Sequence, residues 1–266
     1  IVPAKQQIQK LETKYKGFYI DWAQKGSATG YDVEYSVNAN MSGAVSKHLT
    51  ANKPDTLTVS GLSGDKTYYV RVRSYTNVNG KVYYGAWSDV KSIKTANNDI
   101  TKATVSGIFT KAFTGKAITQ NVTVKVGNTV LKNGTDYTVS YSNNKKVGKA
   151  TVKITGKGKY GGVITKTFKI NPAKQQIQKL TAKSKAFFVD WAQKGSATGY
   201  EIQYATNSKF TGAKKVTITN NKTDKTTVSK LSGNKKYYVR VRSYTTVGGT
   251  KYYGSWSAVK NVTTKK

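Results

Sequence analysis

The sequence predicts an all-β chain made of three tandem antiparallel β-sandwiches in an elongated arrangement. Short runs of alternating apolar and polar residues recur along its 266 residues, and turn dipeptides separate these runs. The first third of the chain is also repeated in the last third. No stretch combines a 3.6-residue periodicity with capping residues over ten positions, so no stable helix is expected.

The repeat gives the predicted domain boundaries. An offset of 169 positions aligns residues 3–95 with residues 172–264 without a gap, and about three in five aligned residues are identical. The segments that both copies share include PAKQQIQKL, DWAQKGSATGY and YYVRVRSY. Self-similarity at a fixed offset is typical of tandem modules. The predicted domains are therefore residues 1–96, an unrelated middle unit at residues 98–170, and residues 171–266.

Each repeat reads as a series of strands. Residues 31–35 alternate, and residues 68–74 place Tyr68, Val70 and Val72 on one face and the two arginines of VRVR on the other. The dipeptides Asn79-Gly80 and Gly248-Gly249 lie between two strand-like runs, which is a hairpin signal. Seven short strands in about 95 residues predict an antiparallel sandwich. Trp22 and Trp191 are the expected core anchors.

The middle unit is also predicted to be all-β. Residues 122–126, 137–141 and 150–154 alternate, and they are joined by turn dipeptides such as Gly127-Asn128, Asn133-Gly134 and Gly161-Gly162. At about 70 residues, and without cysteine, this unit can bury only a modest core.

The motifs of the repeats resemble those of a fibronectin type III module. They are Trp22, the strand Gly30-Tyr31-x-Val33-x-Tyr35, the tyrosine-corner pairs Leu62/Tyr68 and Leu231/Tyr237, and the closing Gly85-Ala86-Trp87-Ser88. In the middle unit, FTGKAIT, LKNGTDYTVSY and VGKATVKITGKGKYGG resemble a short bacterial immunoglobulin-like repeat. Modules of both kinds occur in large surface or secreted proteins of clostridia-related Gram-positive bacteria. The resemblance thus implies an extracellular, secreted or cell-wall-associated protein. Ile1-x-Pro3 matches Ile170-x-Pro172, so another middle-type unit is expected upstream.

Charge is the strongest compositional signal. The chain has 45 Lys and Arg against 12 Asp and Glu, a net charge of +33. The three predicted domains carry +6, +11 and +16. Such a field attracts anionic polymers. Only four of the basic residues are arginine, the residue type that reads bases and binds phosphate in a bidentate manner, so no specific nucleic-acid recognition is expected.

The residues needed for catalysis or for a cofactor are scarce. There is no cysteine, three Glu, and one histidine, His48, which is Thr217 in the second repeat and is predicted to be a surface residue in a turn-rich stretch. Asp32 and Glu34 are expected to form exposed cross-strand pairs with Arg71 and Arg73, worth ~0.2–1 kcal/mol each. No enzyme activity, cofactor, metal site or membrane span is expected.

One constellation carries a candidate site. Tyr83, Tyr84 and Trp87 follow the strand that bears Arg71 and Arg73, and their copies are Tyr252, Tyr253, Trp256, Arg240 and Arg242. Stacking of arginine on tryptophan is a cation–π interaction. Two interpretations stay open: a structural ladder that joins the last strands, or a flat aromatic and cationic face that binds a sugar or a protein.

The sequence leaves three functional classes to compare. The first is a non-enzymatic binding segment of an adhesin, which engages a host glycoprotein (mucin, matrix protein or immunoglobulin) or an anionic wall polymer. The second is a structural stalk that presents another domain of a larger protein. The third, a nucleic-acid binder, is disfavoured by the low arginine content. A monomer is expected in each case.

Overall fold

The computed structural model describes residues 2–24, 26, 28–53 and 55–266. Ile1, on which the expectation of an upstream unit depends, lies outside the described residues. The chain divides into two compact units. Unit 1 comprises residues 1–106, 123–140 and 153–165, and unit 2 comprises residues 107–122, 141–152 and 166–266. The first repeat therefore lies within unit 1 and the second within unit 2, while the predicted boundaries at residues 97 and 170 stay predictions.

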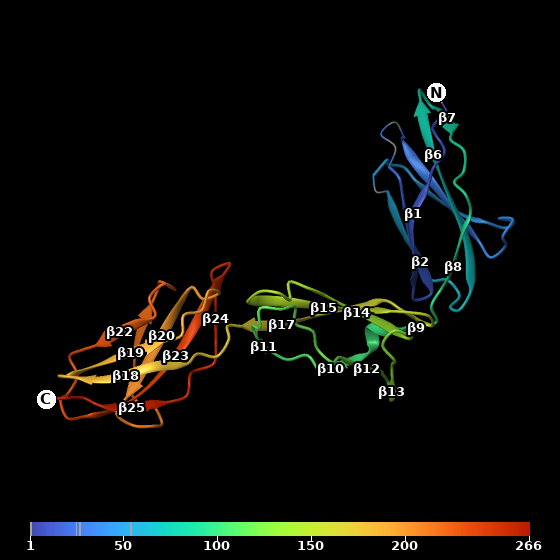
Figure 1. Ribbon diagram of the computed structural model, residues 1–266. Helices are drawn as coiled ribbons and strands as arrows, with labels where there is room; N and C mark the ends of the chain where they lie inside the picture. The colour runs from blue at the N-terminus through green and yellow to red at the C-terminus, as the bar shows by residue number, and fades with distance from the viewer. Residues whose placement is uncertain (1, 25, 27, 54) are drawn as a thin grey trace. The chain divides into compact units, whose positions relative to one another are not determined.

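The prediction of an all-β fold is confirmed. Within the described part of the chain the helical structure amounts to one 3-10 turn, η1 (Ile100–Lys102), which Asp99 caps by accepting a hydrogen bond from the Thr101 backbone. All other regular elements are strands (Figure 1).

The first repeat forms two antiparallel sheets. One has the order β1-β2-β5 (Ile8–Lys14, Gly17–Trp22 and Thr56–Val59). The other has the order β4-β3-β6-β7 (Val45–Leu49, Gly30–Ser36, Thr67–Val78 and Lys81–Tyr84), and β8 (Lys91–Lys94) also pairs with β6. The second repeat reproduces both sheets: β18-β19-β22 (Ile177–Lys183, Ala186–Trp191, Lys225–Val228), and β21-β20-β23-β24 (Lys214–Ile218, Gly199–Ala205, Lys236–Val247, Thr250–Tyr253) with β25 (Lys260–Thr263) on β23.

Over its described residues each repeat contains eight strands rather than the seven predicted, because the last strand is broken in two. After β7 the chain leaves β6 at Gly85, where a Cβ atom would lie 2.7 Å from the Pro3 carbonyl oxygen. Ser88 then restores contact, since its Oγ accepts a hydrogen bond from the Val72 backbone N–H and its own N–H donates to the Val72 carbonyl. Gly254 and Ser257 repeat this break in the second copy. The break frees Trp87 and Trp256 from the regular strand alternation.

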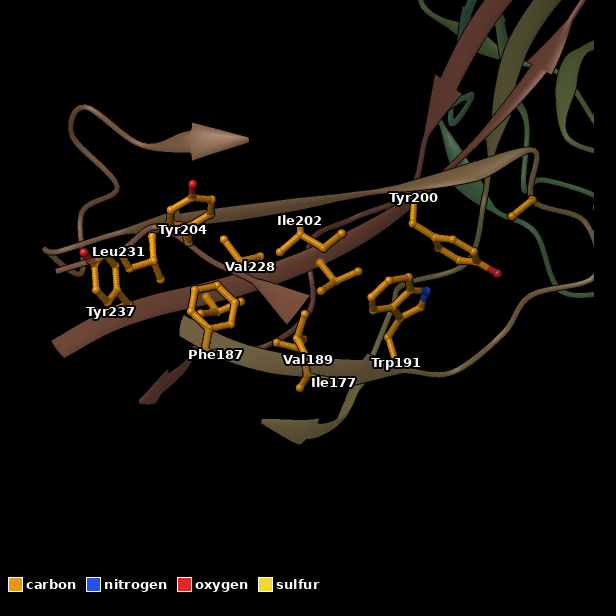
Figure 2. Packing of buried hydrophobic residues seen from close by; sticks show 13 residues of the cluster. Ile177, Phe187, Val189, Trp191, Tyr200, Ile202, Tyr204, Val228, Leu231 and Tyr237 are labelled. Carbon is orange, nitrogen blue, oxygen red and sulfur yellow. The ribbon is translucent and has the colours of Figure 1, made fainter. Parts of the chain in front are cut away.

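The core of each repeat lies between its two sheets. Figure 2 shows this core in the second repeat, with Trp191 packed toward Tyr200 and Phe187 toward Tyr204. Trp22 and Trp191 are fully buried, as predicted. The tyrosine corners also form, because the hydroxyl oxygens of Tyr68 and Tyr237 accept hydrogen bonds from the Ser63 and Ser232 backbone N–H groups.

The residues between the repeats also form strands, which range from two to nine residues in length. They are β9 (Asn98–Asp99), β10 (Thr104–Ser106), β11 (Lys111–Ala112), β12 (Thr123–Val126), β13 (Thr129–Val130), β14 (Tyr137–Ser142), β15 (Gly148–Gly156), β16 (Tyr160–Gly161) and β17 (Val163–Asn171). Two sheets have the orders β10-β12-β13 and β11-β17-β15-β14. The pairs β11–β17 and β9–β16 are parallel, each over two residues, so this part is not purely antiparallel.

Truncation of a core tryptophan should unfold its repeat. We expect Trp22→Ala to lower the free energy of unfolding by ~3–5 kcal/mol, because a fully buried indole leaves both a lost transfer energy and a cavity. Denaturant unfolding of the whole chain measures this, with the exposed Val45→Ala as the control. An unchanged midpoint for Trp22→Ala would show that the strand assignment is wrong.

Candidate functional site

Most of the candidate residues lie on the outer face of the five-stranded sheet, where a row of side chains crosses neighbouring strands. Register places Asp32 on β3 opposite Arg73 on β6, and opposite His48 on β4. Tyr84 on β7 faces Tyr75, two residues beyond Arg73. Directly opposed residues of an antiparallel pair point to the same face. The two arginines of β6 and the two acidic residues of β3 therefore lie together on this face.

The two arginines of the first repeat stack on its aromatic rings. The guanidinium carbons of Arg71 and Arg73 lie 4.3 and 4.4 Å from the centroid of the Trp87 ring, so both arginines contact the indole. Arg73 also lies 3.8 Å from the centroid of the Tyr84 ring. This set of residues, the arginine ladder, recurs in the second repeat. There Arg240 and Arg242 lie 4.7 and 4.4 Å from Trp256, and Arg242 lies 4.0 Å from Tyr253.

The acids beneath the ladder are buried, which corrects the expectation of exposed pairs. Asp32 is 5 % exposed and Glu201, its copy, 2 %. Arg73 Nε donates to Asp32 at 2.9 Å, and Arg242 donates to Glu201 through Nε at 2.8 Å and Nη2 at 2.6 Å. A carboxylate at such depth is costly unless it is paired and hydrogen-bonded. The expected partners are confirmed, but the pairs are structural elements rather than exposed surface contacts.

Each buried carboxylate holds a second basic partner, and the two repeats supply it differently. In the first repeat His48 Nδ1 lies 2.6 Å from Asp32 Oδ1, and the imidazole stacks on Tyr75 at 4.7 Å. His48 lies on β4 rather than in a turn, and its side chain is half exposed, so the prediction of a surface residue is confirmed. In the second repeat Lys215 Nζ donates to Glu201 Oε1 at 2.8 Å. Sequence reasoning missed both partners, although the joint change of Asp32 to Glu201, Ser46 to Lys215 and His48 to Thr217 between the copies was a usable signal.

The ladder also differs at its first arginine. Arg71 donates to Glu34 Oε2 through Nε at 2.9 Å and Nη2 at 2.6 Å. In the second repeat Gln203 replaces Glu34, and Arg240 donates to Gln203 Oε1 at 2.8 Å and stacks on Phe210 at 4.1 Å. Burial, and next the charge of Arg242, lowers the pKa of Arg240. An aromatic ring thus takes over part of the stabilisation that a counter-charge gives Arg71.

Two predicted site residues do not belong to the ladder. Tyr83 pairs with Thr76 and Tyr252 with Thr245, so both project from the face opposite to Tyr84 and Tyr253. Lys81 Nζ lies 5.5 Å from the centroid of the Tyr83 ring. Tyr252 lines a hollow of unit 2 together with Val247 and residues 141–149, which run from the end of β14 to the start of β15.

One family model matches part of the chain. Residues 171–259 match the family described as "Fibronectin type III domain". This match spans most of the second repeat. The chain is also similar to a solved structure entitled "Crystal structure of chicken CNTN1 FN1-FN3 domains", at 16 % identity and a TM-score of 0.32, over 100 % of this chain and 99 % of that one. No curated protein matches the chain.

Over the described ranges, no three His, Asp or Glu side chains lie close enough together to hold a metal ion. In the same part of the chain, no helix is long and apolar enough to cross a membrane.

The buried glutamate predicts an acid-sensitive second repeat. Burial raises the pKa of Glu201, but hydrogen bonds from Lys215 and Arg242 outweigh burial, so this pKa lies below its ordinary value of 4.5. A lowered folded-state pKa stabilises the fold above the unfolded-state pKa, and this stabilisation is lost as the pH falls through the folded-state value. The free energy of unfolding, measured with denaturant, should therefore fall between neutral and acid pH. This fall should be smaller in Glu201→Gln. An equal acid dependence in Glu201→Gln would contradict the assignment.

Proposed function

We propose that this chain is a non-enzymatic binding segment of a bacterial cell-surface or secreted adhesin. Its ligand in this proposal is an anionic host glycoprotein, such as a mucin, or an anionic wall polymer. The observation that carries the proposal is that half of the acidic residues are already engaged in ion pairs inside the protein. Among the described residues six of the twelve acids, including the two most buried, form ion pairs within their own repeat, at Glu12, Asp32, Glu34, Asp65, Asp89 and Glu201. Most of the basic residues in the described part of the chain are therefore left without an ion-pair partner.

The arrangement of the carboxylates supports a non-enzymatic role. A general acid, general base or nucleophile must reach a substrate in a cleft. Asp32, Glu34 and Glu201 instead point at guanidinium groups that are themselves covered by aromatic rings. These acids hold strands together and are not available to a substrate.

The lysines and the ladder contribute differently to the proposed binding. Charge steers association and sets its salt dependence, whereas specificity comes from rings and arginines that are buried at the contact. Tyr84, 44 % exposed at the rim of the ladder, is the aromatic residue of this face that a protein ligand would contact first.

A spacer is the second candidate function. The two repeats share their core tryptophan, their tyrosine corner and their ladder, all of which are features of folding. A stalk needs only these features. A glycan and protein array probed with the whole chain at about 150 mM salt, where charges more than ~8 Å apart are screened, separates the two candidates. The binding proposal predicts a ligand that survives this salt, and the absence of any ligand favours the spacer.

The role of the ladder rim is tested with adjacent tyrosines. For a protein ligand found on the array, we expect Tyr84→Ser to weaken binding by about tenfold, the effect of losing ~1.4 kcal/mol at a contact residue. Tyr83→Ser is the matched control, because it removes a neighbouring tyrosine on the other face of the same strand. Replacement of four lysines of residues 98–170 by Gln should change mainly the salt dependence. Equal affinity in Tyr84→Ser and Tyr83→Ser would show that the ladder rim is not the contact.

A further inference from the structure

The outer face of the three-stranded sheet carries a carboxylate in the first repeat that the second repeat lacks at the matching position. In the second repeat Thr181 on β18, Phe188 on β19 and Thr227 on β22 are in register and form a row across the sheet. Lys179 and Lys183 stand two residues to either side of Thr181, on the same face. We name these five residues the Phe188 face. In the first repeat the matching row is Glu12, Tyr19 and Thr58, and the flanking lysines are Lys10 and Lys14.

The first repeat shows what the two lysines hold. Glu12 lies between them, with its Oε1 2.7 Å from Lys10 Nζ and its Oε2 3.1 Å from Lys14 Nζ. Both ammonium groups also lie over the Tyr19 ring, at 6.0 and 5.5 Å from its centroid. The hydrogen bond from Lys10 lowers the pKa of Glu12. Burial raises this pKa, but the hydrogen bond and charge of Lys14 lower it further, so the pKa lies below its ordinary value. A carboxylate is thus bound between two lysines above an aromatic ring.

The second repeat has the same surroundings without the carboxylate. Thr181 replaces Glu12, and in the described structure neither Lys179 nor Lys183 forms an ion pair. Lys183 Nζ lies 3.5 Å from Thr227 Oγ1 and 5.5 Å from the centroid of the Phe188 ring. Asp190 shares this face, opposite Lys179 in register, but forms no ion pair with it. Lys183 thus lies over the ring as Lys14 does in the first repeat, and Lys179 keeps its register position beside Thr181, while the carboxylate between the two lysines is missing.

We propose that the Phe188 face binds the carboxylate of an acidic saccharide, which takes the place that the Glu12 side chain occupies in the first repeat. This inference deepens the proposed function and rests on it, because it names a ligand class and a site for the binding segment. The carboxylate lies between Lys179 and Lys183, and the sugar ring lies on Phe188.

The surroundings favour a saccharide over an acidic peptide. Peptides bind sheets by adding a strand to an open edge, or bind grooves through an amphipathic helix. Phe188 lies on the central strand of its sheet, whose backbone groups are already paired with β18 and β22. A half-buried ring flanked by two exposed threonine hydroxyls instead matches a pyranose, whose C–H face packs on the ring while its hydroxyl groups bond to Thr181 and Thr227.

The test uses the trimer of galacturonic acid as the probe and the whole chain as the protein. The trimer is titrated into the protein at about 150 mM salt. Calorimetry measures the affinity, and NMR chemical shift changes in β18 and β19 locate the binding site. Thr181→Glu installs the residue of the first repeat and should weaken binding at least about tenfold. Thr250→Glu adds the same charge on the β23–β24 hairpin of the other sheet and should leave the affinity within about twofold of the parent.

The reverse exchange gives a gain of function. Glu12→Thr frees Lys10 and Lys14, and we expect a second binding site, with NMR shifts on β1 and β2. The trimethyl ester of the trimer should not bind, because it lacks the carboxylates. A poly-glutamate peptide of equal charge should bind more weakly, and equal or tighter binding of this peptide would overturn the choice of a saccharide.

The outcomes separate this inference from the proposed function. Binding of the trimer that Thr181→Glu leaves unchanged would overturn the Phe188 face and leave a binding segment in place. No binding of the trimer, with a different ligand found on the array, would also overturn the site alone. The absence of any anionic or protein ligand would overturn both. Near-ultraviolet circular dichroism of each variant confirms that its fold is unchanged.

Discussion

A carboxylate buried under an arginine on the outer face of the larger sheet is the constraint on which each repeat depends. Asp32 and Glu201 are nearly inaccessible, and a charge in that position is tolerated only with good partners. Each carboxylate accepts hydrogen bonds from the arginine opposite it in register, so the pair aligns β3 with β6, and β20 with β23. The other side of the arginine stacks on Trp87 or Trp256. This tryptophan can reach the arginine because the last strand is broken just before it. Register, strand break and ring stacking are thus linked through one ion pair.

The same constraint explains how the copies diverge. Where the acid is Asp32 the second partner is His48, and where the acid is the longer Glu201 it is Lys215, which comes from a different position of the neighbouring strand. Two partners are kept although their identities change. The change on the three-stranded sheet is of another kind. Thr181 replaces the carboxylate of Glu12, so Lys179 and Lys183 lack the partner that Lys10 and Lys14 have in the first repeat. The first kind of change preserves folding, and the second alters what the surface offers to a ligand.

Alternation within a strand was enough to predict much of this structure. It located the strands, the buried faces of β6 and β23, and the pairing of Asp32 and Glu34 with the arginines. It also contained a signal that was not used, since Tyr83 and Tyr84 are adjacent in one strand and cannot share a face.

The remaining features depend on contacts between distant segments. The burial of Asp32 and the contact of Phe210 with Arg240 involve loops and strands that no local pattern brings together. The eighth strand arises because Ser88 bonds through its side chain to Val72, which a search for hairpins does not reveal.

A double-mutant cycle on Glu201 and Arg242 tests the central constraint most directly. The free energies of unfolding of Glu201→Gln, Arg242→Gln and the double variant are compared with the parent at neutral pH. We predict a coupling above ~1 kcal/mol, with Arg242→Gln alone costing more than the double variant because it leaves a buried carboxylate without its main partner. Additive effects, with no coupling beyond ~0.3–0.5 kcal/mol, would contradict the account.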